Sequence, residues 1–243
     1  MLRKGALLLV LGVLFCQPLQ AQDLALETVL ERYFDAQGGL DLIQGIETMK
    51  GTGRMTVGPG TEAAFTRYAK RPNMVRVEIE IQGMTGIQAF DGETAWWFMP
   101  FAGQTSPEIM PEDMAVAMLE EADLDGPLVD YESKGNQVEL MGMEDADGAA
   151  AYKLQVTSKT GKVQYYYIDA ETYLLVKVTG SASVEGMELE YATTFSDFRD
   201  VNGLMVPHHV DMSGMQGPGT TGVVIIETLE INSEIDDNIF RMQ

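Results

Sequence analysis

Hydrophobic and polar residues alternate with a period of two over much of this chain. The alternation is clearest in VRVEIEI (75–81), YKLQV (152–156) and MELEY (187–191). A period of two places apolar side chains on one face of a β-strand and polar side chains on the other. Turn signals separate these segments: Gly58-Pro59-Gly60, Arg71-Pro72-Asn73, Asp91-Gly92, Asp147-Gly148, Asn202-Gly203 and Gly217-Pro218-Gly219. The pattern predicts about eleven or twelve strands in an antiparallel meander.

Two segments show helical spacing instead. Apolar residues recur three and four positions apart over 24–37, and Gly38-Gly39 follows as an end signal. A second helix is predicted within 106–123, inserted between groups of strands. Its three methionines stand four positions apart: Met110, Met114 and Met118. Such a stripe fits the underside of a lid and equally fits a helix packed on a filled core, and the spacing leaves both interpretations open.

The strand predicted at 94–99 is apolar on both faces, because Trp96, Trp97 and Phe98 follow one another. A sheet of about a dozen strands has to close, split into a sandwich or curl. A widely curled sheet encloses more space than its own side chains fill, and the surplus becomes a ligand cavity. In a sandwich, both aromatic faces are ordinary core. The residues by themselves are compatible with either arrangement.

The net charge of the chain argues against a nucleic-acid partner. The chain holds 37 acidic and 16 basic residues, and its formal net charge is −21. Nucleic acids and anionic membrane surfaces are bound mainly through basic side chains. We therefore expect no nucleic-acid partner.

Residues 1–21 have the pattern of a secretory signal peptide. A basic head, Arg3-Lys4, precedes the apolar run 5–15, and Leu19-Gln20-Ala21 offers a cleavage site. Lipoprotein processing at Cys16 is the competing interpretation, although Phe15 stands where a small residue is expected. Cleavage after Ala21 leaves one domain, 22–243, without cysteine and hence without disulfides or thiolate sites. We expect this domain to be exported.

No strong catalytic or metal-binding pattern stands out. His208 and His209 are adjacent, so on a strand they point to opposite faces and do not share a metal ion. The segment 145–148 lacks the ligand spacing of a calcium loop and predicts a turn. Glu188 and Glu190 are expected on the polar face of their strand, and the common hydrolase, zinc-protease and phosphate-loop motifs are missing. We expect a protein that is not an enzyme and uses no metal or cofactor.

Residues 69–103 resemble a known family. In LolA proteins, the periplasmic carriers of outer-membrane lipoproteins, a Lys-Arg-Pro-Asn turn, a strand, an Asp-Gly-x-Thr turn, an aromatic strand and a Pro-Phe end follow in this order. The matching elements here are Lys70-Arg71-Pro72-Asn73, Asp91-Gly92-Glu93-Thr94, Trp96 to Met99, and Pro100-Phe101. The resemblance implies a mainly β fold, namely an incomplete antiparallel β-barrel (a LolA-like half-barrel) with an N-terminal helix and an inserted lid helix.

In such a fold the lid covers an apolar cavity that receives acyl chains. Methionine suits this surface because its thioether side chain repacks at low cost. The lipid-binding residues implied here are Val77, Ile79, Met84, Trp96, Trp97, Phe98, Met99, Phe101, Met110, Met114 and Met118.

Arg71 is matched to the arginine that hydrogen-bonds the lid in LolA and favours the closed, empty state. The resemblance therefore implies that Arg71 is a lid latch, acting through its guanidinium donors on backbone carbonyls. By composition alone, an arginine in a tight turn is an ordinary solvated residue.

The implied function is a monomeric periplasmic carrier. It takes the acyl chains of lipoproteins, or a related lipid, from an inner-membrane transporter toward an outer-membrane acceptor. Segments 33–43 and 120–130 differ from LolA proper, so a relative with another lipid cargo stays open. Two further functions also stay open: a sensor or regulatory module that detects mislocalised lipoproteins, and a structural envelope domain with a filled core.

Overall fold

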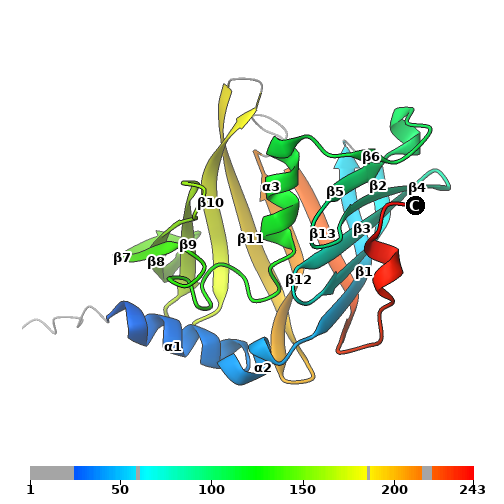
Figure 1. Ribbon diagram of the computed structural model, residues 1–243. Helices are drawn as coiled ribbons and strands as arrows, with labels where there is room; N and C mark the ends of the chain where they lie inside the picture. Colours follow the sequence, from blue (N-terminus) through cyan, green and yellow to red (C-terminus); the bar gives the residue numbers. More distant parts are fainter. Residues whose placement is uncertain (1–24, 59–60, 185–186, 215–220) are drawn as a thin grey trace, which may run out of the picture.

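The computed structural model describes residues 25–243, except 59–60, 185–186 and 215–220 (Figure 1). The predicted signal peptide, 1–21, lies outside this part of the chain, as do Cys16 and the predicted turn at 217–219. Within it, no helix combines the length and the apolar character required to cross a membrane.

Thirteen strands of the described chain form one sheet, in which every neighbouring pair is antiparallel. The strands are β1 (Thr48–Gly58), β2 (Thr61–Lys70), β3 (Met74–Ile81), β4 (Met84–Phe90), β5 (Ala95–Phe98), β6 (Glu108–Ile109), β7 (Gln137–Ala146), β8 (Ala149–Thr157), β9 (Val163–Asp169), β10 (Leu175–Val184), β11 (Met187–Val201), β12 (Leu204–Ser213) and β13 (Thr221–Ile231). The order β6-β5-β4-β3-β2-β1-β13-β12-β11-β10-β9-β8-β7 leaves β6 and β7 with one neighbour each, so the sheet does not close into a barrel. The predicted half-barrel is confirmed.

The sheet consists of two meanders rather than one. Strands β1 to β6 form the first and β7 to β13 the second, and the pairing of β1 with β13 joins them at the centre of the sheet. We call this pairing the central seam. The hairpins inside each meander use the predicted turn chemistry: Asp147-Gly148 and Asn202-Gly203 both have positive φ angles, as two-residue hairpin turns require.

The helices lie on one face of the sheet, here called the inner face (Figure 1). They are α1 (Leu26–Gln37), α2 (Leu40–Gln44) and α3 (Glu112–Glu121). Two short 3₁₀ turns, η1 (Pro100–Ala102) and η2 (Asp237–Phe240), follow β5 and β13. Helix α1 ends as predicted, because Gly38 takes the left-handed conformation with φ of 119°. A side chain is excluded there as well, since a Cβ on Gly38 would stand 2.2 Å from the carbonyl oxygen of Gly203.

The topology explains why α3 lies over the sheet. Strands β6 and β7 are consecutive in the chain but occupy opposite edges of the sheet. The segment between them therefore has to cross from one edge to the other, and it contains α3. Figure 1 shows α3 in front of the strands, between the β7–β10 side and the β3–β6 side. The inserted helix is thus a strap across the inner face.

The outer face carries the C-terminal segment, which follows β13 and contains η2 (Figure 1, red). Donors from β2, β3 and β5 hold its backbone carbonyls: Lys70 Nζ lies 2.8 Å from Ile235 O, Arg76 Nη1 lies 2.6 Å from Ile239 O, and Trp96 Nε1 lies 2.7 Å from Phe240 O. The side chain of Phe240 is fully buried. This segment covers the outer face of β2 to β5.

Candidate functional site

The two adjacent tryptophans of β5 lie on opposite faces of the sheet. Trp97 is on the inner face, where it packs against the cluster formed with α3. Trp96 is on the outer face, 2% exposed, with its Nε1 bonded to Phe240 O and the Arg76 guanidinium over its ring. The aromatic run thus separates two layers, the α3 strap on one side and the C-terminal segment on the other.

Strand register assigns the other predicted lipid-binding residues to their faces, since directly paired residues share a face. Val77 pairs with Gln88, which pairs with Trp97, so all three are on the inner face. Phe98 pairs with Ile87 and falls on the outer face with Trp96. The structure therefore does not bring Trp96 and Phe98 together with the rest of the predicted set. The residues that it does gather on the inner side are Val77, Ile79, Met84, Trp97, Met99, Phe101, Met110, Met114 and Met118.

Gly86 explains how Met99 and Phe101 reach the inner face. A Cβ placed on Gly86 would stand 2.5 Å from the Phe101 ring and 2.8 Å from the sulfur of Met99. Both side chains therefore fold over the bare backbone of β4, next to Ile79, with which Gly86 pairs. A glycine in a strand frequently marks such a close approach.

The methionine stripe is not continuous on α3. The helix begins at Glu112, after Pro111, so Met110 precedes it, and the helix is shorter than the predicted segment. Met110 and Met118 are buried in the cluster under α3, whereas Met114 is 38% exposed. Val116 and Leu119 add further exposed apolar surface to this short helix.

Two hydrophobic clusters occupy opposite sides of the inner face: one joins α1 to β7–β10, and the other joins α3 to β3–β5. A third cluster fills the α2 end of the central strands, where Ile43, Ile46, Val129 and Leu204 pack together. Between the first two clusters, the inner side of the central strands carries half-buried apolar side chains that were not predicted as site residues: Met55, Phe65, Phe195, Val210, Met212, Val224 and Ile226. Apolar side chains left half-buried between two filled clusters make this region a candidate binding surface for an apolar ligand.

Four ion pairs attach the C-terminal end of α3 and the residues after it. We call them the α3 ion pairs: Glu120–Lys162 at 2.8 Å, Glu121–Arg67 at 3.1 Å, Asp123–Lys134 at 2.6 Å and Asp125–Arg71 at 2.5 Å. Lys162 lies in the turn between β8 and β9, whereas Arg67 lies on β2. The end of the strap is thus tied to both meanders.

Arg71 makes more hydrogen bonds than any other cation of the α3 ion pairs. Its Nη1 donates to Asp125 Oδ2 at 2.8 Å, its Nε donates to Ile46 O at 2.6 Å, and its Nη2 donates to Ile43 O at 3.2 Å. The hydrogen bonds from Arg71 hold the pKa of Asp125 below its ordinary value, so the carboxylate is charged at neutral pH. The carbonyls belong to α2 and the link into β1; the contact with the strap is the carboxylate of Asp125.

Loss of the Glu120–Lys162 pair is expected to loosen α3 measurably. Lys162→Ala removes a half-exposed ion pair, which typically contributes ~0.2–1 kcal/mol. Amide hydrogen exchange in α3 should then accelerate about 1.4- to fivefold, because opening of the helix becomes less costly. Lys159→Ala, in the same turn, is the matched control. Equal exchange in both variants would contradict a tether at Lys162.

The two histidines are not part of this candidate site. His208 Nδ1 lies 3.0 Å from Val206 O, and His209 pairs instead with Asp211. In the described part of the chain, no group of three His, Cys, Asp or Glu side chains is placed to hold a metal ion.

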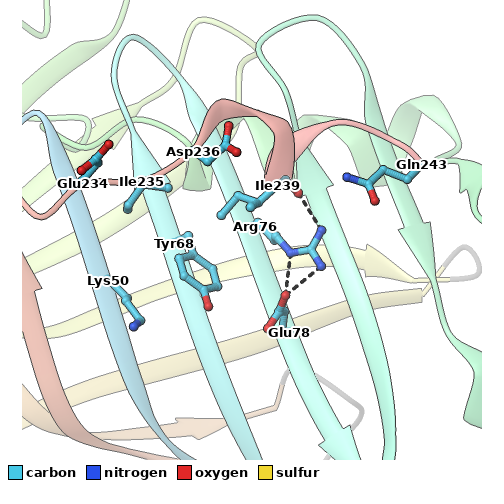
Figure 2. Close-up of a pocket in the computed structure, with 9 residues that line it drawn as sticks. All are labelled: Lys50, Tyr68, Arg76, Glu78, Glu234, Ile235, Asp236, Ile239 and Gln243. Atoms are coloured by element: carbon cyan, nitrogen blue, oxygen red, sulfur yellow. Dashed lines mark hydrogen bonds and ion pairs between the residues drawn. The ribbon is translucent and has the colours of Figure 1, made fainter.

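Figure 2 shows an open pocket of about 370 Å³ on the outer face, beneath the C-terminal segment. Arg76 is already engaged there by Glu78 and Ile239 O, and the lining mixes acidic and basic side chains. A second open pocket, of about 690 Å³, lies over β8–β12 and is lined by lysines and tyrosines, among them Lys153 and Tyr165. Both linings mix polar and apolar surface in similar amounts, so neither is the predominantly apolar pocket that an acyl chain needs.

The sequence matches one family of known proteins. Over residues 83–243 the chain matches a family model described as an uncharacterized protein. A search of the curated proteins finds no match.

Solved structures similar to this chain share its fold at low sequence identity. They include a LolA superfamily protein from Nitrosomonas europaea (TM-score 0.60, 16% identity), a DUF1329 family protein from Desulfovibrio piger (0.61, 14%) and a domain described as an outer membrane lipoprotein-sorting protein from Vibrio parahaemolyticus (0.57, 13%). Each similarity covers 88% of this chain and 96% of the other. The chain belongs to the family of uncharacterized proteins that the matching model describes, and it shares its fold with LolA-superfamily structures.

Proposed function

We propose that this protein is a periplasmic carrier that binds the acyl chains of lipoproteins, or of a related lipid, between α3 and the inner face of the sheet. One observation carries the proposal: half-buried apolar side chains lie between two separate core clusters, under a helix that crosses the sheet. The fold shared with LolA-superfamily proteins supports it.

Acyl chains match this surface in chemistry. Burial of each CH₂ group contributes about 0.8 kcal/mol, so partial burial of one chain already stabilises a complex against return to a membrane. The methionines on the inner side, such as Met55, Met114 and Met212, repack around chains of different shape at low cost. Arg71 and the other α3 ion pairs would hold the strap down when no ligand is bound.

In this proposal residues 22–243 form a single exported domain, with 1–21 removed as a signal peptide. The protein acts as a monomer without enzymatic activity. It receives its cargo from an inner-membrane transporter and delivers it to an outer-membrane acceptor. A carrier has to bind strongly enough to extract and weakly enough to release, so its closed, empty state competes with the loaded state.

Tryptophan emission gives a direct test, because the chain has two tryptophans on opposite faces. Titration of the Trp96→Phe variant with a single-chain acyl lipid should shift the emission of Trp97 and saturate near one ligand per chain. The Trp97→Phe variant, which reports from Trp96 beneath Phe240, should change little. Unchanged emission in both variants, with no heat of binding by calorimetry, would refute the proposal.

Native mass spectrometry of the protein purified from its own periplasm separates the alternatives. A co-purified lipid or lipoprotein supports the carrier. A stoichiometric protein partner without lipid would support a sensor. A bare monomer that binds no lipid probe would support a structural domain with a filled core.

A further inference from the structure

Trp97 carries a buried hydrogen-bond donor without an acceptor. Among the described residues, two buried side-chain polar atoms lack a partner, Trp97 Nε1 and Ser233 Oγ. An indole N–H is a donor only, and leaving it buried and unpaired costs free energy. Its neighbour Trp96 makes the contrast clear, because Trp96 Nε1 donates to Phe240 O at 2.7 Å. The same strand thus holds one satisfied and one unsatisfied indole.

The surroundings of the Trp97 ring are apolar on the side of the strap and belong to the candidate site. Together with Val77 from β3, the ring packs against the cluster that contains Met110, Met118 and Ala122. Its directly paired neighbours on the adjacent strands, Gln88 and Glu108, are polar. The cation on the neighbouring part of the inner face, Arg67, is engaged by the carboxylate and the backbone carbonyl of Glu121. The unpaired donor therefore lies where the apolar part of a ligand would enter between α3 and β5.

We propose that Trp97 Nε1 donates a hydrogen bond to the carbonyl oxygen of an acyl ester or amide when a ligand separates α3 from β5. This inference rests on the proposed carrier function and names the group of the cargo that is recognised. A neutral donor on a ring that packs against the apolar strap, with the acidic Glu108 on the paired strand, matches a neutral acceptor joined to a hydrocarbon chain. Phosphate and free carboxylate groups fit poorly, because a charged group needs several donors or a cation to offset its desolvation.

The unpaired donor also affects the balance between the empty and loaded states. In the empty state Trp97 Nε1 is buried without a partner, and in the loaded state it gains one. The hydrogen bond therefore forms only on binding and favours an acyl chain over an alkyl chain of equal length. We expect a preference of about five- to tenfold, as for one buried hydrogen bond between neutral groups.

Two probes that differ only in this carbonyl test the inference. They are 1-palmitoyl-lysophosphatidylcholine, which has the ester carbonyl, and 1-O-hexadecyl-lysophosphatidylcholine, in which a methylene group replaces that carbonyl and the linking oxygen is kept. Isothermal titration calorimetry should give the wild-type protein the five- to tenfold preference for the acyl probe, and Trp97→Phe should bind both probes equally. An N-palmitoyl dipeptide, compared with the same ether probe, tests an amide carbonyl as the source of the acceptor.

Trp96→Phe is the matched control, because it removes an indole donor that already has a partner. It should lower the melting temperature and keep the acyl preference, whereas Trp97→Phe should not lower the melting temperature of the empty protein. In ¹H–¹⁵N spectra the indole proton of Trp97 should move downfield with the acyl probe and not with the ether probe.

The outcomes separate this inference from the function on which it rests. Equal affinity of the wild-type protein for all three probes would overturn the role of Trp97 Nε1 while leaving a lipid carrier in place. A preference for the ester or for the amide identifies which carbonyl is read. Binding of none of the probes would overturn the carrier function, and the inference with it.

Discussion

Met114→Asp is expected to reduce the affinity for a single-chain acyl lipid by about 30- to 150-fold. Met114 stands one helical turn before the buried Met118, at the exposed margin of the α3 face that packs against β3–β5. An acyl chain between α3 and the sheet would contact this position. A carboxylate there would be desolvated against hydrocarbon, and a cost of ~2–3 kcal/mol corresponds to the stated loss of affinity. Calorimetric titration of the variant measures it.

Val116→Asp is the matched control for this prediction. Val116 is on the same helix, is 37% exposed against 38% for Met114, and lies on the opposite side of the helix from Met118. The two variants introduce the same charge at similar exposure. Comparable losses of affinity would show that the Met114 side of α3 does not contact the ligand. A large fall in melting temperature confined to Met114→Asp would instead assign Met114 to the packed core.

Arg71→Leu is expected to leave lipid loading intact and to impair lipid transfer. The substitution removes the contacts of Arg71 with Asp125, Ile43 and Ile46, which tie the strap to α2 and β1. A hydrogen bond to a charged group contributes ~1.5–3 kcal/mol, so the closed, empty state should lose about ten- to hundredfold in population relative to the open state. The variant should accept a labelled lipoprotein at least as well as the wild type and release it poorly to an acceptor.

Arg54→Leu is the control for Arg71, since Arg54 forms exposed ion pairs with Glu62 and Glu227 elsewhere on the sheet. Normal transfer by Arg71→Leu would refute the latch role, and weakened loading would assign Arg71 to cargo binding. The latch should not respond to pH near neutrality. Because the pKa of Asp125 is lowered, the stabilisation from this pair is complete above the ordinary value of 3.8 and is lost only as the pH falls through the lowered pKa.

The local elements could be predicted from the sequence because their signals are local. Alternation identified the strands at 75–81, 152–156 and 187–191, and the glycine pair after Gln37 marked the end of α1. The division into two meanders depends on the pairing of β1 with β13, between segments far apart in the chain, for which no local pattern exists. The start of α3 was missed because Pro111 stands at its N-cap position, which puts Met110 outside the helix.

The site could be predicted only in part, for a physical reason. Where a strand alternates clearly, as at Val77 and Ile79, its apolar face is the inner one and the assignment follows. Strand β5 is apolar on both faces, so its sequence does not distinguish Trp97 from Trp96 and Phe98; the C-terminal segment makes that distinction by covering Trp96. The inner residues of β13, such as Val224 and Ile226, lie in a continuous apolar run and give no period at all.

The central seam has a consequence for the order in which the sheet forms. Within each meander, neighbouring strands are joined by hairpins or short connections, and such contacts form early at low entropic cost. The seam instead unites segments as distant as Thr48 and Ser233, whose hydrogen bond spans 185 residues. Closing a loop of this length before any compensating contact exists is unfavourable, so the two meanders should acquire structure independently. The last backbone hydrogen bonds to form are therefore expected at the middle of the finished sheet, after the hairpins within each meander.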